Sequence, residues 1–277
     1  MMIFFVHIQK TSGSSINKIL KSQKNCRIRY KNDDRIWYKS FDKYREKNIL
    51  SGHVPYGIHK KMNLRKFSYF TFLRDPIQRW KSQFYHGLDR DKSIGYYLFE
   101  KNGNDLKRFL EWCIRNEVSS NIMVKQIYGM ESVNNILEWR EWEKWKCGDK
   151  KISYDELKEM NKNKNYGNKD FGYFQIYGWS GRNKKTSDKY YNTMLDEAKI
   201  NLKHKFDFVG LQENSYEDHV RLCKFYGFKA PKKNVVVRKS SKKEQFDWED
   251  KEVVALLNEL NKYDIELYKY AISEVVK

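Results

Sequence analysis

An apolar run that breaks into a turn of small residues and restarts as a helix constrains this chain more than any other stretch. Residues 3–8 are mostly apolar, residues 9–15 read Gln-Lys-Thr-Ser-Gly-Ser-Ser, and residues 16–20 carry apolar side chains at helical spacing. A buried strand that turns directly into a helix leaves several backbone N–H groups unpaired and pointing in one direction. With Lys10 beside them, these groups predict a binding site for a phosphate or sulfate group.

The order of residues in this turn differs from that in the phosphate loop of nucleoside triphosphatases. That loop has two glycines separated by four residues, and its Lys-Ser/Thr pair follows the second glycine. Here Lys10 and Thr11 precede Gly13, which is the only glycine in the turn. We therefore do not predict a nucleoside triphosphatase.

Length and charge limit the domain count and the kind of partner. A chain of 277 residues can bury one substantial core, so we expect a single domain over 1–277 with an insertion at 131–190. The 55 Lys and Arg residues exceed the 36 Asp and Glu residues by 19. This excess favours a polyanionic partner such as an acidic polysaccharide, nucleic acid or an anionic membrane face. A lysine-rich proteome would produce the same excess, so charge alone discriminates little.

The cysteines and the apolar runs suggest where the protein resides. The four cysteines are far apart and form no Cys-x-x-Cys pair, which predicts neither a zinc site nor a disulfide framework. The core strand begins almost at residue 1, and no run of about 18 apolar residues occurs. We expect a soluble, cytoplasmic protein without a membrane span, or one of the Golgi lumen if the sequence is truncated.

A second strand-to-helix junction follows about sixty residues after the first. Residues 66–75 are aromatic and β-prone, and are too continuously apolar for a half-exposed strand. Asp75 is suited to cap the next helix, with Pro76 in its first turn. Arg74 at the strand end and Ser82 on the helix would then present a guanidinium and a hydroxyl group to a second anion.

Both junctions resemble motifs of the sulfotransferases. Residues 7–15 resemble the 5'-phosphosulfate loop of that family, with Gln9 in place of the usual proline. Residues 71–82 resemble its 3'-phosphate motif, in the Leu-Arg-Asp-Pro-x-x-Arg-x-x-Ser form of the heparan sulfate 2-O- and 6-O-sulfotransferases and their microbial relatives. Further similar segments are 121–126, 208–213 and 261–271. The resemblance covers most of the chain except about 131–190.

This resemblance implies a fold and a reaction. The fold would be α/β, with a P-loop-type central parallel β-sheet flanked by helices and an inserted segment near the acceptor site. The reaction would be in-line transfer of a sulfuryl group from 3'-phosphoadenosine 5'-phosphosulfate (PAPS) to an acceptor hydroxyl, without a metal. Lys10 would act at the oxygen that bridges sulfur and phosphorus, while Arg74 and Ser82 would hold the 3'-phosphate. The residues that would cradle the 5'-phosphosulfate are Thr11, Ser12, Gly13, Ser14 and Ser15.

An acceptor hydroxyl needs a general base, and His53 is our candidate. It follows a short apolar strand, where open α/β sheets place their chemistry, and the imidazole of an unperturbed histidine has a suitable pKa. The Gly52-His53-Val54 context is similar to the segment that carries the catalytic histidine of the 2-O-sulfotransferases. His7 fits a structural position inside the first strand, and His59 and His86 are reserve candidates.

The identity of the acceptor stays open at this level. Net positive charge and the resemblance favour a glycan, in particular an acidic polysaccharide, and we expect no nucleic-acid partner. A lipid-linked glycan, a protein tyrosine and a small molecule are alternatives, and nothing indicates the oligomeric state. Two other functions compete with sulfuryl transfer: a P-loop kinase-like phosphotransferase, and a basic module that binds a polyanion without turnover.

Overall fold

The computed structural model describes most of the chain outside the predicted insertion. The described residues are 1–24, 28–31, 48–53, 55–88, 94–115, 117–129, 187–235 and 246–276. The predicted insertion at 131–190 therefore lies outside them except for its last residues, as do Cys26 and Cys147. The described cysteines, Cys113 and Cys223, are buried free thiols.

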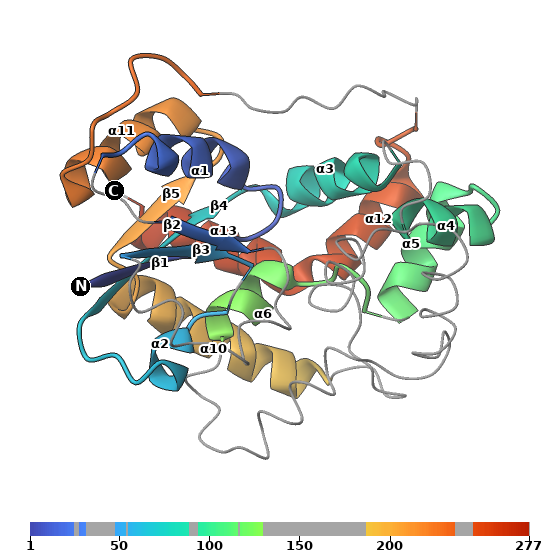
Figure 1. The fold of residues 1–277 in the computed structure, drawn as a ribbon. Coiled ribbons are helices and arrows are strands. Elements are labelled where there is room, and N and C mark those ends of the chain that lie inside the picture. Colours follow the sequence, from blue (N-terminus) through green and yellow to red (C-terminus); the bar gives the residue numbers. More distant parts are fainter. Residues whose placement is uncertain are drawn as a thin grey trace, which may run out of the picture.

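A parallel β-sheet forms the centre of the described structure (Figure 1). Its strands are β1 (Met2–Val6), β2 (Ile28–Lys31), β3 (Ile49–Gly52), β4 (Phe67–Leu73) and β5 (Phe208–Leu211). They lie in the order β2-β3-β1-β4-β5, and every neighbouring pair is parallel. All side chains of β1 are buried because this strand lies in the middle with helices over both faces. The predicted α/β fold with a central parallel sheet is confirmed.

Within the described residues, two helices cover one face of the sheet. They are α1 (Gly13–Lys21) and α11 (Ser215–Tyr226), which lie above the sheet in Figure 1. Ile16 and Leu20 of α1 pack on Ile3 and Phe5, the side chains that β1 directs to this face. The α1 sequence forms a helix here because its apolar side chains recur every three to four residues and meet the sheet as one stripe.

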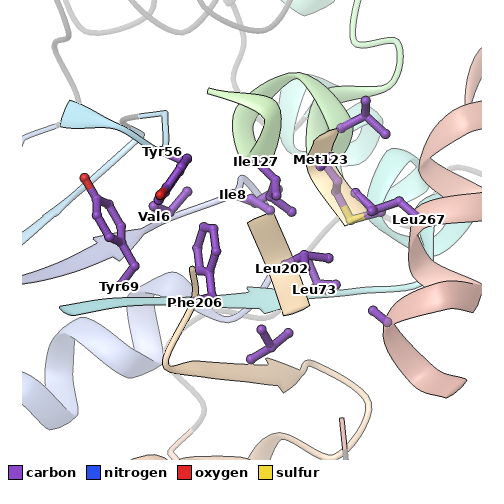
Figure 2. Packing of buried hydrophobic residues seen from close by; sticks show 14 of the residues in the cluster. Val6, Ile8, Tyr56, Tyr69, Leu73, Met123, Ile127, Leu202, Phe206 and Leu267 are labelled. Atoms are coloured by element: carbon purple, nitrogen blue, oxygen red, sulfur yellow. The ribbon is translucent and has the colours of Figure 1, made fainter. Parts of the chain in front are cut away.

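The largest apolar cluster fills the opposite face of the sheet (Figure 2). Helices α2 (Ile58–Lys61), α6 (Ile122–Tyr128), α10 (Asp188–His204) and α13 (Lys262–Glu274) contribute to it. Met123, Leu202 and Leu267 come from three of these helices and meet side chains of β1 and β4, among them Val6 and Leu73. This packing ties segments that are distant in sequence to the central strand.

A separate helical cluster lies at one end of the sheet. It contains α3 (Pro76–Leu88), α4 (Ile94–Lys101), α5 (Leu106–Arg115) and α12 (Lys251–Leu260), which are grouped together in Figure 1. Helix α3 contributes an apolar stripe, because Trp80, Phe84 and Leu88 are buried in this cluster. The long α3 thereby joins the sheet edge to a second apolar cluster.

Two helix termini cap each other between α6 and α13. The Asp264 carboxylate accepts hydrogen bonds from the N–H groups of Met123 (3.1 Å) and Val124 (2.8 Å). In return, the Asn121 side-chain oxygen accepts from the N–H groups of Tyr263 (2.9 Å) and Asp264 (3.2 Å). Helix N-termini have unpaired N–H groups, so this exchange fixes the two helices relative to each other.

Local backbone features set two of the helix boundaries. Helices α12 and α13 are separated at Asn261, whose backbone is not helical. Helix α10 begins at Asp188, and the Ser187 side chain caps its N-terminus. Within the described parts of the chain, no helix is both long and apolar enough to cross a membrane.

Candidate active site

The loop between β1 and α1 has an unusual backbone conformation and is held by an internal hydrogen bond. Lys10 and Ser12 have φ angles of 65° and 66°, a left-handed conformation that is uncommon for residues with a side chain. Between them, the buried hydroxyl of Thr11 donates to the Ile8 carbonyl at 2.7 Å. Such strained backbone persists only where the surroundings hold it, and it is concentrated at functional sites.

The N-terminus of α1 lies where the sequence predicts an anion site. Ser12 precedes the helix but makes no side-chain cap, and its hydroxyl donates instead to Gln212 Oε1 at 3.0 Å. The N–H groups of Ser15 and Ile16 donate to the Ser12 carbonyl at 2.9 and 3.1 Å, so those of Gly13 and Ser14 are the ones that could meet a ligand, with the positive end of the helix dipole behind them. Ser14 is exposed and Ser15 is buried in this first turn. A phosphate-like group fits this end of the helix better than a neutral one.

Gly13 is required by the position of the His7 ring. A Cβ atom added to Gly13 would lie 1.7 Å from His7 Nε2, so the imidazole occupies the space of a side chain. His7 in turn stacks on Phe5, with 5.2 Å between ring centroids. His7, expected inside the first strand, directly follows β1, and its ring lies against Gly13 at the start of α1.

Gly13→Ala is expected to lower the free energy of unfolding by about 1–3 kcal/mol, because the new methyl group overlaps the His7 ring. Chemical denaturation measures this change. The double variant His7→Ala/Gly13→Ala tests the cause, since removal of the ring should recover much of the loss and give a favourable coupling energy. Additive effects of the two substitutions would contradict this explanation.

The second junction, between β4 and α3, meets the first. Arg74 Nη1 donates to the Lys10 carbonyl at 3.2 Å, which joins the two motifs across 64 residues of sequence. Asp75 caps α3 as predicted, because its carboxylate accepts from the Gln78 N–H at 2.8 Å. Burial lowers the pKa of Arg74, while the nearby carboxylates of Glu213 and Asp75 raise it. The structure thus brings Lys10 and Arg74 together at the carboxyl edge of the sheet.

Residues after β5 brace both junctions. Gln212 accepts from Ser12 beside α1, while the Glu213 carboxylate accepts from the Asp75 N–H at 2.8 Å beside α3. These two adjacent residues therefore connect the two strand-to-helix junctions, β1–α1 with Lys10 and β4–α3 with Arg74, which we call the anion corners. Ser82 lies two helical turns into α3 and is half-buried.

His53 follows the end of β3 at the same edge of the sheet. Its Nδ1 lies 2.7 Å from the His7 carbonyl oxygen, and its ring stacks on the His7 ring with centroids 4.4 Å apart. A carbonyl oxygen only accepts hydrogen bonds, so Nδ1 carries the proton and Nε2 keeps its lone pair. Since His7 also contacts Gly13, a single histidine ring separates His53 from the anion loop.

The surroundings of His53 change its pKa from the ordinary value expected from the sequence. Burial lowers the pKa of His53 to about 4, although the hydrogen bond to the His7 carbonyl opposes this shift. Burial likewise lowers the pKa of His7 well below its usual value, and repulsion from His53 and Lys10 lowers it further. In the free protein, His53 is therefore neutral throughout the neutral pH range.

These shifts predict loss of stability in acid. Burial also lowers the pKa of His219 to about 4. Between about pH 6.5 and pH 4 the unfolded chain binds protons that the folded chain does not. The free energy of unfolding should therefore fall with pH, by about 1.4 kcal/mol per pH unit for each such histidine. Denaturant titrations at several pH values measure the slope, and His53→Gln should reduce it; identical slopes would refute the assignment.

The reserve histidines lie away from the anion loop. The His59 ring stacks on Phe67, the first residue of β4, with 3.8 Å between centroids. This position is at the amino edge of the sheet, opposite to the edge that carries His53. His86 is half-buried in the last turn of α3, three turns beyond its first residue. Neither position supports a role beside Lys10.

Several residues of the site were not foreseen from the sequence. Gln126 of α6 donates to the His7 carbonyl, and Gln212 accepts from Ser12. Arg79 of the second motif is fully buried, and its charge acts on Asp264 in the core. Among the described residues, no group of three or more His, Cys, Asp or Glu side chains is placed to hold a metal ion. The only sequence signal for Gln126 and Gln212 is that they lie in the segments 121–126 and 208–213, which resemble sulfotransferase segments.

Comparison with known proteins agrees with the geometry. A family model described as "Sulfotransferase family" matches residues 2–271. The chain belongs to this family. It is therefore an enzyme of the sulfotransferase type, which transfers sulfuryl groups to an acceptor. A search of curated proteins found no match to the chain.

Proposed function

We propose that this sulfotransferase transfers a sulfuryl group from PAPS to a hydroxyl group of an acidic polysaccharide. The observation that carries the proposal is the hydrogen bond between Arg74 and the Lys10 carbonyl. Two anion corners that adjoin in this way suit a donor with negative groups at its 5' and 3' positions. A single phosphate would need only one of them.

The donor would be held at two points. Lys10 and the N–H groups of Gly13 and Ser14 at the start of α1 suit the 5'-phosphosulfate, since they combine a positive charge with hydrogen-bond donors. Arg74 offers a forked guanidinium group to the 3'-phosphate, and Ser82 on the same junction adds a hydroxyl group. The hydroxyls of Thr11 and Ser12 are engaged within the protein, so these residues would contribute mainly through their backbone.

His53 would act as the general base. Its Nε2 would accept the proton of the acceptor hydroxyl while the acceptor oxygen forms a bond to sulfur. The bond from sulfur to the bridging oxygen breaks in the same step, and Lys10 would stabilise the charge that develops on the leaving phosphate. Adenosine 3',5'-bisphosphate then leaves. Two anionic groups of a bound donor would favour the protonated imidazole and raise the pKa of His53 from its low value in the free protein.

The acceptor is the least specified part of the proposal. The formal net charge of +19 favours an acidic glycan over a neutral one. The resemblance of residues 71–82 to the heparan sulfate 2-O- and 6-O-enzymes points to the same class. We propose an O-linked product on a polysaccharide of this kind.

A transfer assay with labelled PAPS tests the function. The acceptor panel contains heparan-type, chondroitin-type and neutral polysaccharides, and a parallel reaction contains labelled ATP with Mg²⁺. Label on an acidic polysaccharide from PAPS alone is the expected result. Transfer from ATP would indicate a kinase, and salt-dependent binding to heparin without affinity for adenosine 3',5'-bisphosphate would indicate a module without turnover.

A further inference from the structure

One backbone carbonyl, that of His7, receives two buried side-chain hydrogen bonds. His53 Nδ1 donates to it at 2.7 Å, and Gln126 Nε2 donates to it at 3.1 Å. A carbonyl oxygen has two lone pairs, so both bonds can form together, and each restricts the direction left for the other. The orientation of the His53 ring is therefore linked to the position of Gln126.

The backbone of Gln126 also contacts the segment that follows His53. Its carbonyl oxygen accepts from the Tyr56 N–H at 3.0 Å. Near the same point, a Cβ atom added to Gly129 would lie 2.4 Å from the Tyr56 carbonyl oxygen, so the end of α6 lies directly against this backbone. Gln126 thus makes two contacts near His53. Its side chain binds the His7 carbonyl, to which His53 also donates, and its backbone binds Tyr56, three residues after His53.

Helix α6 is a rigid support for these contacts. The Asp264 carboxylate caps its first turn, and Asn121 returns the cap to α13. Four of its seven residues belong to the main apolar cluster: Ile122, Met123, Val124 and Ile127. Gln126 is 4% exposed, which restricts its rotamers and excludes most competing water.

From these contacts we propose that Gln126 is a positioning residue for His53. It orients the His7 carbonyl so that His53 stays in the tautomer protonated at Nδ1, in which Nε2 carries no proton. The inference rests on the proposed role of His53 as the base, because orientation of the Nε2 lone pair matters only if Nε2 accepts a proton. Gln126 acts through the carbonyl and makes no contact with the reacting atoms.

The test replaces Gln126 by methionine, which keeps most of the volume and removes the donor. Two measurements are made: the His53 tautomer by ¹⁵N and ¹³C NMR of labelled protein, and steady-state kinetics of transfer. We expect the Nδ1-protonated form to lose population and kcat to fall about tenfold, the effect of one hydrogen bond. The Kd for adenosine 3',5'-bisphosphate should not change. Gln83→Met, at a half-buried glutamine of α3, is the matched control and should match the wild type in all three measurements.

The outcomes separate this inference from the proposed function. An unchanged tautomer and an unchanged kcat in an active Gln126→Met enzyme overturn the positioning role and leave the function intact. A changed tautomer in a protein that transfers no sulfate supports the positioning role and refutes the function. If Gln126→Met does not fold, Gln126→Asn carries the same test, because its shorter side chain keeps the amide but cannot reach the carbonyl.

Discussion

His53→Ala is expected to lower kcat for sulfuryl transfer by about 100- to 10,000-fold, the usual contribution of a general base. An unassisted hydroxyl group is a poor nucleophile, and the neighbouring His7 ring is packed against Gly13 and has a pKa well below its usual value. Affinity for adenosine 3',5'-bisphosphate should stay within a few-fold, because the anion corners at Lys10 and Arg74 are formed by other elements. A transfer assay and calorimetry measure the two effects separately.

Two further variants control this experiment. His53→Gln retains a donor for the His7 carbonyl but has no basic nitrogen, so it should be as inactive as the alanine variant while folding more stably. His86→Ala removes a histidine from the far end of α3 and should leave kcat unchanged. Near wild-type turnover of His53→Ala would mean that the base lies elsewhere.

Arg74→Ala is expected to weaken binding of adenosine 3',5'-bisphosphate by about 10- to 150-fold, because a hydrogen bond to a charged group contributes about 1.5–3 kcal/mol. The guanidinium group is held by the Lys10 carbonyl and flanked by Glu213, so it is already oriented before a ligand arrives. Arg74→Lys retains the charge but loses the fork, and should recover only part of the affinity. Isothermal titration calorimetry measures the dissociation constants.

A comparison of two nucleotides makes this test specific for the 3'-phosphate. AMP has no 3'-phosphate, so its weaker binding should change little in Arg74→Ala. Lys10→Ala should weaken both nucleotides, because its ammonium group would face the 5' end that they have in common. An equal loss for both nucleotides in Arg74→Ala would indicate that the substitution only disturbs the Lys10 loop through the lost 3.2 Å bond.

Much of the architecture around the site could be predicted because it is encoded locally. A buried strand that meets small residues and then a helical repeat can form only a strand-to-helix corner, and Asp75-Pro76 marks the second corner in the same way. Parallel strands end at one edge, so placing Lys10, His53 and Arg74 near that edge needed no knowledge of long-range contacts. The prediction of a central parallel sheet came from the resemblance of both corners to the sulfotransferase motifs.

The sequence alone determined the strand-to-helix corners and the chemical groups that each of them carries, because these depend on residues close together along the chain. Only the tertiary structure decided how those groups are held and charged. Gln126 and Gln212 reach the loop from 119 and 200 residues away, and burial lowers the pKa of His53 to about 4. The physical reason is that hydrogen-bond partners and desolvation depend on which distant segments pack together, and no local spacing records that.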